Sequence, residues 1–271
     1  TWGCFDYSQQ EPRLVVHYAA SSSSICKDES VVEIVDKFKD ESVDFHQTVA
    51  DMANIERTQA KTINLGLFYG MGKAKLQAEL GLNTKQEAEN LFDKYHESVP
   101  FVKDLMDKTS REASKNGYVR TLLRRRCNFP KWEVNEFRRG KLSVTGTRVE
   151  TEARFIEDYK EKYPDADEEK INLIRKNLSS EDQDLIKRAF TYKALNKLIQ
   201  GSAADMTKKA MLDLYKEGIV PHIQIHDELD ISVQSKEQVN KIIDIMENAV
   251  KLKVPNKVDY ESGDNWGDIY D

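Results

Sequence analysis

In the first half of the chain, the spacing of hydrophobic and polar residues is typical of a strand at the start and of helices after it. The apolar positions before Asp6 predict a short strand, and residues 13–20 predict a helix that the serine cluster at 21–24 interrupts. Apolar positions three and four residues apart predict further helices at 31–38, 55–68, 85–95 and 102–114, and an amphipathic segment capped by Asp44. Gly70 and Gly72 are placed to end the helix at 55–68.

The second half of the chain combines short apolar runs with longer helical patterns. Asn116-Gly117 is a turn signal, and residues 118–123 after it predict a strand. Ser180 and Gln183 have the spacing of a capping box, which predicts a long helix after them with a break near Gly201. The other expected elements are strands at 222–225 and 229–233 around a tight turn at Asp227, an amphipathic helix at 237–251 and an irregular tail at 263–267.

Composition places the chain among globular proteins with one large domain or two small ones. Its 271 residues are 39% hydrophobic and 32% charged, which excludes collagen-like, low-complexity and membrane-spanning classes. No apolar run approaches the ~18 residues of a membrane span, and the N-terminus lacks the pattern of a signal peptide. The 3 cysteines form no CxxC pair, so we expect a reducing, cytoplasmic setting without a disulfide frame.

Charge is distributed unevenly along the chain. The net charge of -6 at first argues against a nucleic-acid partner. Residues 101–148, however, hold thirteen basic side chains against five acidic ones, a balance of +8 that leaves -14 for the rest. Nine acids between Glu150 and Glu169 predict a solvated helical insert. A local basic surface can therefore face DNA despite the acidic total.

Two acidic positions follow apolar strands near opposite ends of the sequence. Asp6 ends the first strand, and Asp227 with Glu228 lies at the turn between two later ones. Taken singly, each is typical of a surface acid at a strand end, whereas together they could form one site. Mg²⁺ prefers hard oxygen ligands, and two ions about 3.5–4 Å apart stabilise the attacking and leaving oxygens of phosphoryl transfer. The backbone carbonyl of Tyr7 would add one more oxygen ligand.

The predicted helix at 55–68 carries a second group of candidate site residues along one face. Arg57, Lys61, Leu65 and Tyr69 are four residues apart and follow one slowly turning helix face. Two cations followed by an apolar and an aromatic residue match the polarity of a nucleoside triphosphate, and His46 could donate to a phosphate. An ordinary amphipathic helix with solvated cations has the same pattern.

Two further groups suit contacts with DNA. Asn196 and Gln200 form an i, i+4 amide pair able to donate to minor-groove acceptors, beside small residues at 201–204 that permit a close backbone approach. A basic cluster suits phosphate contacts, although a solvated basic loop is equally consistent with it. The cluster comprises Arg120, Arg124, Arg125, Arg126 and Lys131.

These segments, in this order, resemble the polymerase domain of family A DNA polymerases, the bacterial DNA polymerase I class and its phage relatives. DYSQQEPR is similar to motif A of that family, RTQAKTINLGLFYG to motif B and QIHDEL to motif C. NKLIQGSAAD is similar to its NxxxQGxAAD helix, and GDNW to its C-terminal G-[ED]-N-W. The resemblance covers the chain except about residues 132–188.

The resemblance implies roles for individual residues. Asp6 and Asp227 would hold two Mg²⁺ ions with Tyr7 and Glu228 as further ligands, and Lys61 would donate a proton to pyrophosphate. The residues implied at the dNTP are Glu11, as a steric gate bonded to Tyr69, and His46, Arg57, Lys61, Leu65 and Tyr69. Those implied at DNA are Arg13, Arg120, Arg124, Asn196, Gln200 and His226. Leu65 replaces the usual Phe or Tyr, so sugar selectivity is expected to differ.

The implied fold is α+β, with an antiparallel palm sheet and a mostly helical fingers subdomain. The palm would take residues 1–24, the fingers 25–116 and the rest of the palm 117–271, with the acidic insert at about 132–188 and motif C at 224–228. The family's thumb, first part of the palm and exonuclease domain have no counterpart here, and Thr1 lies close to motif A. We therefore expect a split polymerase whose second polypeptide supplies the thumb and first palm part, with or without a 3′ to 5′ exonuclease.

The expected reaction is template-directed DNA synthesis on primer-template DNA from dNTPs, in the cytoplasm of a phage-infected bacterial cell. In it, a primer 3′-oxygen attacks the α-phosphorus of a dNTP and pyrophosphate leaves. One open alternative is a catalytically inactive nucleic-acid-binding subunit of a replication complex. Another is a metallohydrolase with His222 and His226 as zinc ligands, although HIQIH lacks the Glu of HExxH.

Overall fold

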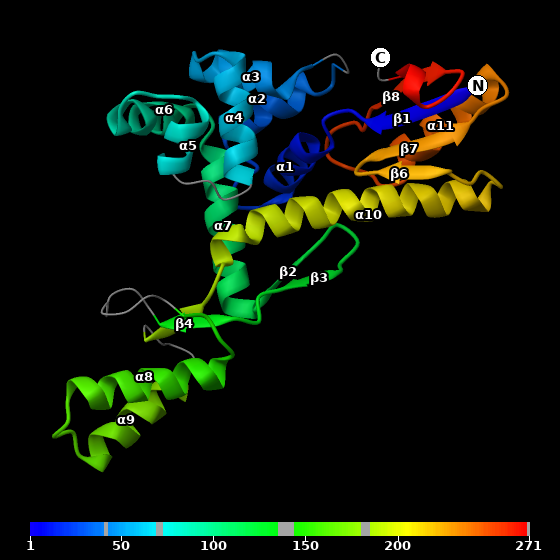
Figure 1. Ribbon diagram of the computed structural model, residues 1–271. Helices are drawn as coiled ribbons and strands as arrows, with labels where there is room; N and C mark the ends of the chain where they lie inside the picture. Colours follow the sequence, from blue (N-terminus) through cyan, green and yellow to red (C-terminus); the bar gives the residue numbers. More distant parts are fainter. Residues whose placement is uncertain (41–42, 69–72, 135–143, 180–184, 270–271) are drawn as a thin grey trace.

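The computed structural model describes residues 1–40, 43–68, 73–134, 144–179 and 185–269 (Figure 1). A four-stranded sheet and a group of helices lie towards opposite ends of the long helix α10 (Ala194–Lys216), and a smaller unit projects away from both (Figure 1). The predicted α+β class, with an antiparallel sheet beside a mostly helical part, is confirmed.

The sheet has the strand order β6-β7-β1-β8, and every neighbouring pair is antiparallel. Its strands are β1 (Trp2–Tyr7), β6 (Ile223–Ile225), β7 (Glu228–Ser232) and β8 (Val258–Gly263). Phe5 and Leu229 are buried on the face that helix α11 (Lys236–Asn248) covers, where the Tyr7 hydroxyl donates to the Met246 carbonyl at 2.7 Å. The strand before Asp6 and the two strands around Asp227 are therefore confirmed.

The helical group contains every helix predicted from the first half of the sequence. Its members are α1 (Gln10–Ser21), α2 (Glu29–Lys37), α3 (Phe45–Ala53), α4 (Arg57–Phe68), α5 (Lys73–Glu79), α6 (Lys85–Ser98) and α7 (Pro100–Asn116). Asp44 caps α3, since its carboxylate accepts from the backbone N–H groups of His46 and Gln47. Helix α5 was not predicted because it is short and buries only Leu76. Gly70 and Gly72 lie outside the described residues.

The predicted turn at Asn116-Gly117 is the end of helix α7, directly before a strand. Gly117 has a φ of 77° and its N–H donates to the Ala113 carbonyl, which ends α7. The strand predicted at 118–123 is shorter, because only β2 (Tyr118–Arg120) pairs with β3 (Arg126–Asn128).

The long helix expected after Ser180 begins later than predicted and has no break. The capping-box residues Ser180 and Gln183 lie outside the described residues, and β5 (Ile186–Arg188) pairs with β4 (Trp132–Val134) where the helix was expected. Helix α10 runs continuously through Gly201. A Cβ atom on Gly201 would lie 2.7 Å from the Thr121 methyl group, so the glycine serves close packing and not a helix break.

The acidic insert is helical, as predicted, and has a small hydrophobic core of its own. Helices α8 (Arg148–Lys162) and α9 (Glu168–Ser179) pack with β4 and β5 around Phe155, Leu178 and Ile186. At its base, the guanidinium carbons of Arg148 and Arg188 lie 5.0 and 4.5 Å from the centroid of the Trp132 ring. The insert extends away from the sheet in Figure 1.

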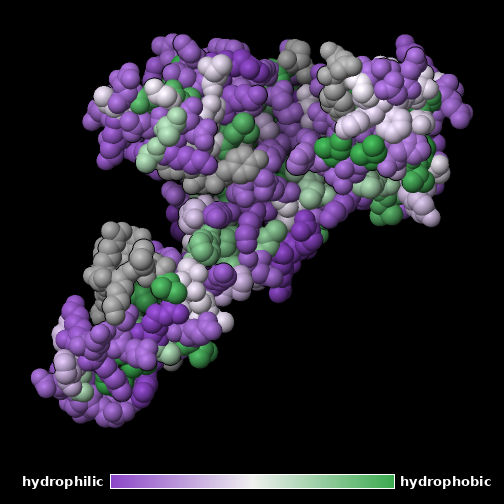
Figure 2. All heavy atoms as spheres, in the orientation of Figure 1, coloured by the Kyte–Doolittle hydropathy of each residue, from purple (hydrophilic) through white to green (hydrophobic). Residues whose placement is uncertain are grey.

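The visible surface is mostly hydrophilic in Figure 2, with hydrophobic side chains gathered near β6 and the neighbouring end of α10. Exposed apolar residues of this region are Leu212, Val220, Ile223 and Ile225. Strand β6 is an edge of the sheet, so these residues flank unpaired backbone groups. Over the described ranges, no helix combines the length and apolar character that crossing a bilayer requires.

Candidate active site

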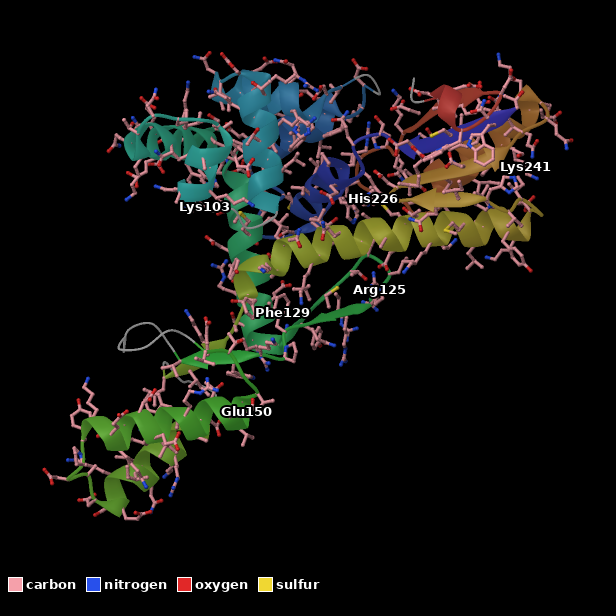
Figure 3. The ribbon with its side chains drawn as sticks, in the orientation of Figure 1. Lys103, Arg125, Phe129, Glu150, His226 and Lys241 are labelled. Carbon is pink, nitrogen blue, oxygen red and sulfur yellow. The ribbon has the colours of Figure 1, made fainter. Side chains whose placement is uncertain are left out.

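The carboxylates predicted to act together meet at one end of the sheet. Asp6 of β1 lies directly opposite Glu228 of β7, and Asp227 immediately precedes Glu228 in the turn from β6. His226 in this turn has a φ of 52°, and its carbonyl accepts from the Gln224 amide at 2.6 Å. Figure 3 shows His226 at the end of the hairpin that points towards α1 and the helical group.

Electrostatic repulsion is concentrated at Asp6. Burial, together with the charges of Asp227, Glu228, Asp259 and Glu261, raises the pKa of Asp6 to about 7. Burial also raises the pKa of Asp227, an effect that its own backbone N–H and His226 oppose. Asp259 and Glu261 lie on β8, which the sequence patterns did not identify. A divalent cation between these acids would remove much of the repulsion, and their hard oxygen donors suit Mg²⁺.

A second set of ligand-type side chains lies next to these acids on the sheet. In the part of the chain that the structure describes, the Cys4 sulfur and carboxylate oxygens of Glu228 and Asp230 lie within 4.8 Å of one another. Asp6 and Asp227 are outside that set, and so are His222 and His226. The His222 ring stacks on Trp2 and its Nε2 lies 3.0 Å from the Ser232 hydroxyl, so the zinc hydrolase alternative gains no support.

The helical group brings together part of the predicted triphosphate-contacting set. His46 in α3 lies near Arg57 and Lys61 of α4, whose charges, after burial, help to lower the pKa of the imidazole. Arg57 is held by Asp44, with its Nε 2.9 Å from the carboxylate, whereas Lys61 is exposed. Leu65 is half-buried further along the same helix. Tyr69 lies outside the described residues, as does its predicted bond with Glu11.

His46 is fixed by a buried hydrogen-bond chain. Its Nδ1 lies 3.1 Å from the Asn64 amide nitrogen, and the Asn64 carbonyl oxygen accepts from the Tyr95 hydroxyl. Asn64 and Tyr95 are fully buried, so a chain of buried polar groups connects α3, α4 and α6. Neither residue was singled out in the sequence, because an isolated Asn in a helix has no distinctive pattern.

The start of α1 connects the sheet to the helical group. Gln9 has a φ of 54°, and its side-chain oxygen accepts from the Phe45 N–H at 2.7 Å while its amide donates to the Val43 carbonyl at 2.8 Å. Glu11 follows in the first turn of α1 and is half-buried. Gln9 was not among the predicted site residues, although it lies inside the motif around Asp6.

Arg13 is placed differently from its predicted contact with DNA. The side chain is 1% exposed, and it donates to the carbonyls of Ser8 and Pro255 at 2.9 and 2.6 Å. Its guanidinium also covers the Phe38 ring at 4.8 Å. Arg13 therefore connects α1 to the segment before β8, and we do not carry it into the proposed DNA contacts.

The basic β2–β3 hairpin is attached to the small-residue segment of α10. Asp205, 5% exposed, accepts from the Leu123 N–H at 3.1 Å and from Arg125 Nε at 3.0 Å. Arg125, labelled beside the hairpin in Figure 3, also donates to the Gly201 carbonyl at 2.8 Å. The close approach predicted for residues 201–204 is thus made by the hairpin. Asp205 was missed because its partners are distant in sequence.

The remaining residues predicted to contact DNA lie on accessible positions. Arg120, Arg124, Gln200 and His226 are exposed, and Asn196 is half-buried. Arg124 has a φ of 66° at the hairpin tip, so the turn places it apart from the paired strands.

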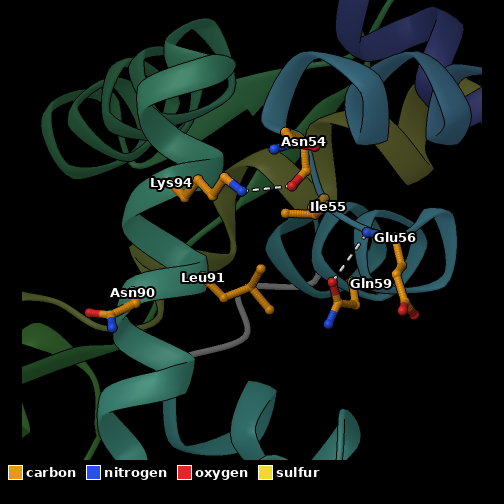
Figure 4. Close-up of a pocket in the computed structure, with 7 residues that line it drawn as sticks. All are labelled: Asn54, Ile55, Glu56, Gln59, Asn90, Leu91 and Lys94. Atoms are coloured by element: carbon orange, nitrogen blue, oxygen red, sulfur yellow. Dashed lines mark hydrogen bonds between the residues drawn. The ribbon is translucent and has the colours of Figure 1, made fainter.

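A shallow hollow of about 590 Å³ lies in the helical group between the start of α4 and α6 (Figure 4). Lys94 donates to the Asn54 carbonyl at 2.6 Å across it, and Glu56 N–H donates to the Gln59 side chain at 3.2 Å. Among the predicted site residues that the structure describes, none lines this hollow.

Comparison with known proteins identifies a family model and several relatives that match the chain. A sequence model of DNA polymerase family A matches residues 2–268. The chain is 32% identical to a DNA-directed DNA polymerase of Pseudomonas phage M6, over 98% of this chain and 38% of that protein. It is also 32% identical to DNA polymerase I of Geobacillus stearothermophilus, over 97% of this chain and 25% of that protein.

A solved structure has a similar fold. The polymerase domain of Pol1 from M. smegmatis, in complex with DNA primer-template and dNTP, matches with a TM-score of 0.67 and 24% sequence identity. The match covers 100% of this chain and 40% of that one. The chain thus spans between about a quarter and two fifths of the length of these proteins.

Proposed function

Because the chain belongs to DNA polymerase family A, we propose that it catalyses template-directed DNA synthesis together with the polymerase segments that its relatives have in addition. The observation that carries this proposal is the meeting of Asp6 with Asp227 and Glu228 at one end of the sheet. These acids come from sequence segments more than two hundred residues apart, and the fold gives them a common location.

In this proposal, Asp6, Asp227, Glu228 and the Tyr7 carbonyl would hold two Mg²⁺ ions. When bound, the ions supply charge stabilisation for the attacking and leaving oxygens of nucleotidyl transfer. The chain's own residues bind and orient the reactants, so that the primer 3′-oxygen lies in line with the α-phosphorus of the dNTP. Lys61, exposed on α4, is the proposed proton donor to the leaving pyrophosphate.

The helical group is the proposed dNTP-binding part. Arg57 and Lys61 lie close enough to His46 to help lower its pKa, and the three side chains present cationic or donor groups for a triphosphate. Arg57 would exchange its Asp44 partner for phosphate oxygens when a dNTP binds. Glu11 and Tyr69 would form the gate against a ribose 2′-hydroxyl, and Leu65 would line the sugar site.

Primer-template DNA is proposed to lie along α10 and the β2–β3 hairpin. Asn196 and Gln200 of α10 would donate to the minor groove, and Arg120 and Arg124 of the hairpin would contact phosphates. His226, at the tip of the β6–β7 turn beside Asp227, would contact the primer terminus. In domain terms, residues 1–24 and 117–271 would form the palm, with the insert at about 132–188, and residues 25–116 the fingers.

Synthesis is proposed to need further polymerase segments, in a second polypeptide or in a longer chain. Relatives are between two and a half and four times as long as the part that matches this chain. Strand β1 has β7 on one side and β8 on the other, so a further strand could join only at an outer edge of the sheet. The β6 edge, with the exposed Ile223 and Ile225, is the proposed junction.

The test of the catalytic assignment is Asp227→Asn, assayed with a polypeptide that supplies the missing segments. Because the acid would hold the metal ions, primer extension should fall by about 10³-fold or more, the effect of losing several kcal/mol of charge stabilisation. Binding of fluorescent primer-template DNA, followed by anisotropy, should be unchanged. Asp213→Asn, on the exposed side of α10, is the matched control and should leave both readouts unchanged.

Extension that is equal for Asp227→Asn and the unchanged chain would overturn the catalytic assignment and favour the nucleic-acid-binding alternative. The same assay with the 271-residue chain alone tests the need for further segments. Robust synthesis by this chain alone would contradict that part of the proposal.

A further inference from the structure

A buried carboxylate on the sheet lacks a hydrogen-bond partner. Asp230 of β7 is 0% exposed, and neither of its carboxylate oxygens has a partner among the described residues. Burial and the charge of Glu228 raise the pKa of Asp230, and the Trp2 indole and the Cys4 thiol beside it oppose this shift without meeting the geometry of a hydrogen bond. An unpaired buried charge is costly, so this carboxylate needs a compensating group.

The register of the sheet supplies two further ligand-type side chains at the same place. Cys4 of β1 lies directly opposite Asp230, and Glu228 is two residues before Asp230 on the same face of β7. The Cys4 sulfur and the oxygens of Glu228 and Asp230 all lie within 4.8 Å of one another. In a tetrahedral zinc site, with ligand atoms about 2.0–2.3 Å from the ion, these atoms are about 3.3–3.8 Å apart, so a bound ion would draw the three side chains slightly closer together than they lie here.

From this arrangement we propose that Cys4, Glu228 and Asp230 form a binding site for a thiophilic divalent transition cation of the zinc class. The sulfur donor distinguishes it from the all-oxygen set of Asp6 and Asp227, because Mg²⁺ does not select thiolate. Two carboxylates and a thiolate would occupy three of the four coordination positions of a tetrahedral ion, and a water molecule would occupy the fourth. Cys4 is 5% exposed and Asp230 is buried, so the cation enters past the half-buried Glu228.

This proposal goes beyond DNA synthesis and does not depend on it. Glu228 belongs to both sets, so a bound transition cation occupies one of the carboxylates that the Mg²⁺ site also uses. Neither Cys4 nor Asp230 is placed in the catalytic machinery.

The test is a titration of the reduced, chelator-treated 271-residue chain with Co²⁺ in the presence of excess Mg²⁺. A thiolate ligand gives cobalt a near-ultraviolet charge-transfer absorption that oxygen ligands do not give, and this band should saturate at one equivalent. Cys4→Ser should abolish the band. Asp230→Asn should weaken Co²⁺ binding by at least about tenfold, because even a lost second-sphere partner costs 10–100-fold in affinity.

The chain offers a matched control in Cys26, a free cysteine outside the set. Cys26→Ser should keep the full band, and circular dichroism should show all variants folded. Absence of the band in the unchanged chain, or its persistence in Cys4→Ser, would overturn the proposal. If Cys4→Ser does not fold, X-ray absorption of the zinc-loaded unchanged chain decides: a sulfur neighbour supports the site, and oxygen neighbours alone refute it.

Discussion

Replacing Asp205 by Ala should release the basic hairpin from α10. The carboxylate accepts one hydrogen bond from the Leu123 backbone and one from the Arg125 guanidinium, while it is almost completely buried. The perturbation therefore removes a buried, charged acceptor that two donors of the hairpin share, although Leu123 itself is 49% exposed.

The magnitude follows from these two bonds. A hydrogen bond to a charged group contributes about 1.5–3 kcal/mol, so the two bonds together set an upper limit of about 3–6 kcal/mol. Arg125 is half exposed and can exchange the carboxylate for water, so its share lies at the lower end. We expect Asp205→Ala to lower the free energy of unfolding by about 2–4 kcal/mol, and Asp205→Asn, which keeps one acceptor, by about half as much.

Urea denaturation followed by circular dichroism measures this loss. Asp213→Ala on the same helix is the control, because its ion pairs with Lys209 and Lys216 lie at the surface and are worth about 0.2–1 kcal/mol. Equal destabilisation by Asp205→Ala and Asp213→Ala would refute the reasoning that the buried acid anchors the hairpin.

Three further changes test other parts of the structure. The pKa of Asp6 is raised to about 7 from its ordinary 3.8, so its contribution to stability is present at low pH and is lost as pH rises towards 7. In a chelator, Asp6→Asn should therefore have a higher urea midpoint than the unchanged chain at pH 8 and a similar one near pH 4; equal midpoints at both would contradict this. Gly201→Ala should lower the thermal midpoint, because overpacking against Thr121 costs about 1–3 kcal/mol and outweighs the helix propensity gain of about 1 kcal/mol; a higher midpoint would show that the hairpin can move aside. Trp132→Ala should speed amide hydrogen exchange in α8 and α9 while leaving the four-stranded sheet protected. The reason is that two cation–π contacts of about 0.5–1 kcal/mol each are lost at the base of the insert. Unchanged exchange in α8 and α9 would contradict this role of Trp132.

Periodicity was sufficient for most helices and for the strands that carry the acids. The turn at Asp227 and the cap at Asp44 depend on neighbouring residues, and such local signals are visible in a sequence. Strands β3, β4 and β5 were not predicted, because each has three residues and lacks the turn signal that precedes β2 or the Asp227 turn that follows β6. Strand β8 was missed because its sequence VDYESG is mostly polar.

The residues that were missed or misplaced depend on contacts between distant segments. Arg13 is buried because carbonyls of Ser8 and Pro255 receive its guanidinium, and nothing near Arg13 in the sequence indicates Pro255. Gly201 resembles a helix breaker, yet it is required by the hairpin that packs on it. The roles of Asp205 and Asp230 likewise cannot be recognised until their neighbours in the folded structure are known.

The central claim is that Asp6 and Asp227 act together in nucleotidyl transfer. Its most direct test is single-turnover incorporation of one dNTP into a labelled primer by the chain combined with the missing polymerase segments. The account predicts Mg²⁺-dependent incorporation that is lost in Asp6→Asn and in Asp227→Asn and kept in Asp213→Asn. Incorporation by either active-site variant at the rate of the unchanged chain would contradict it.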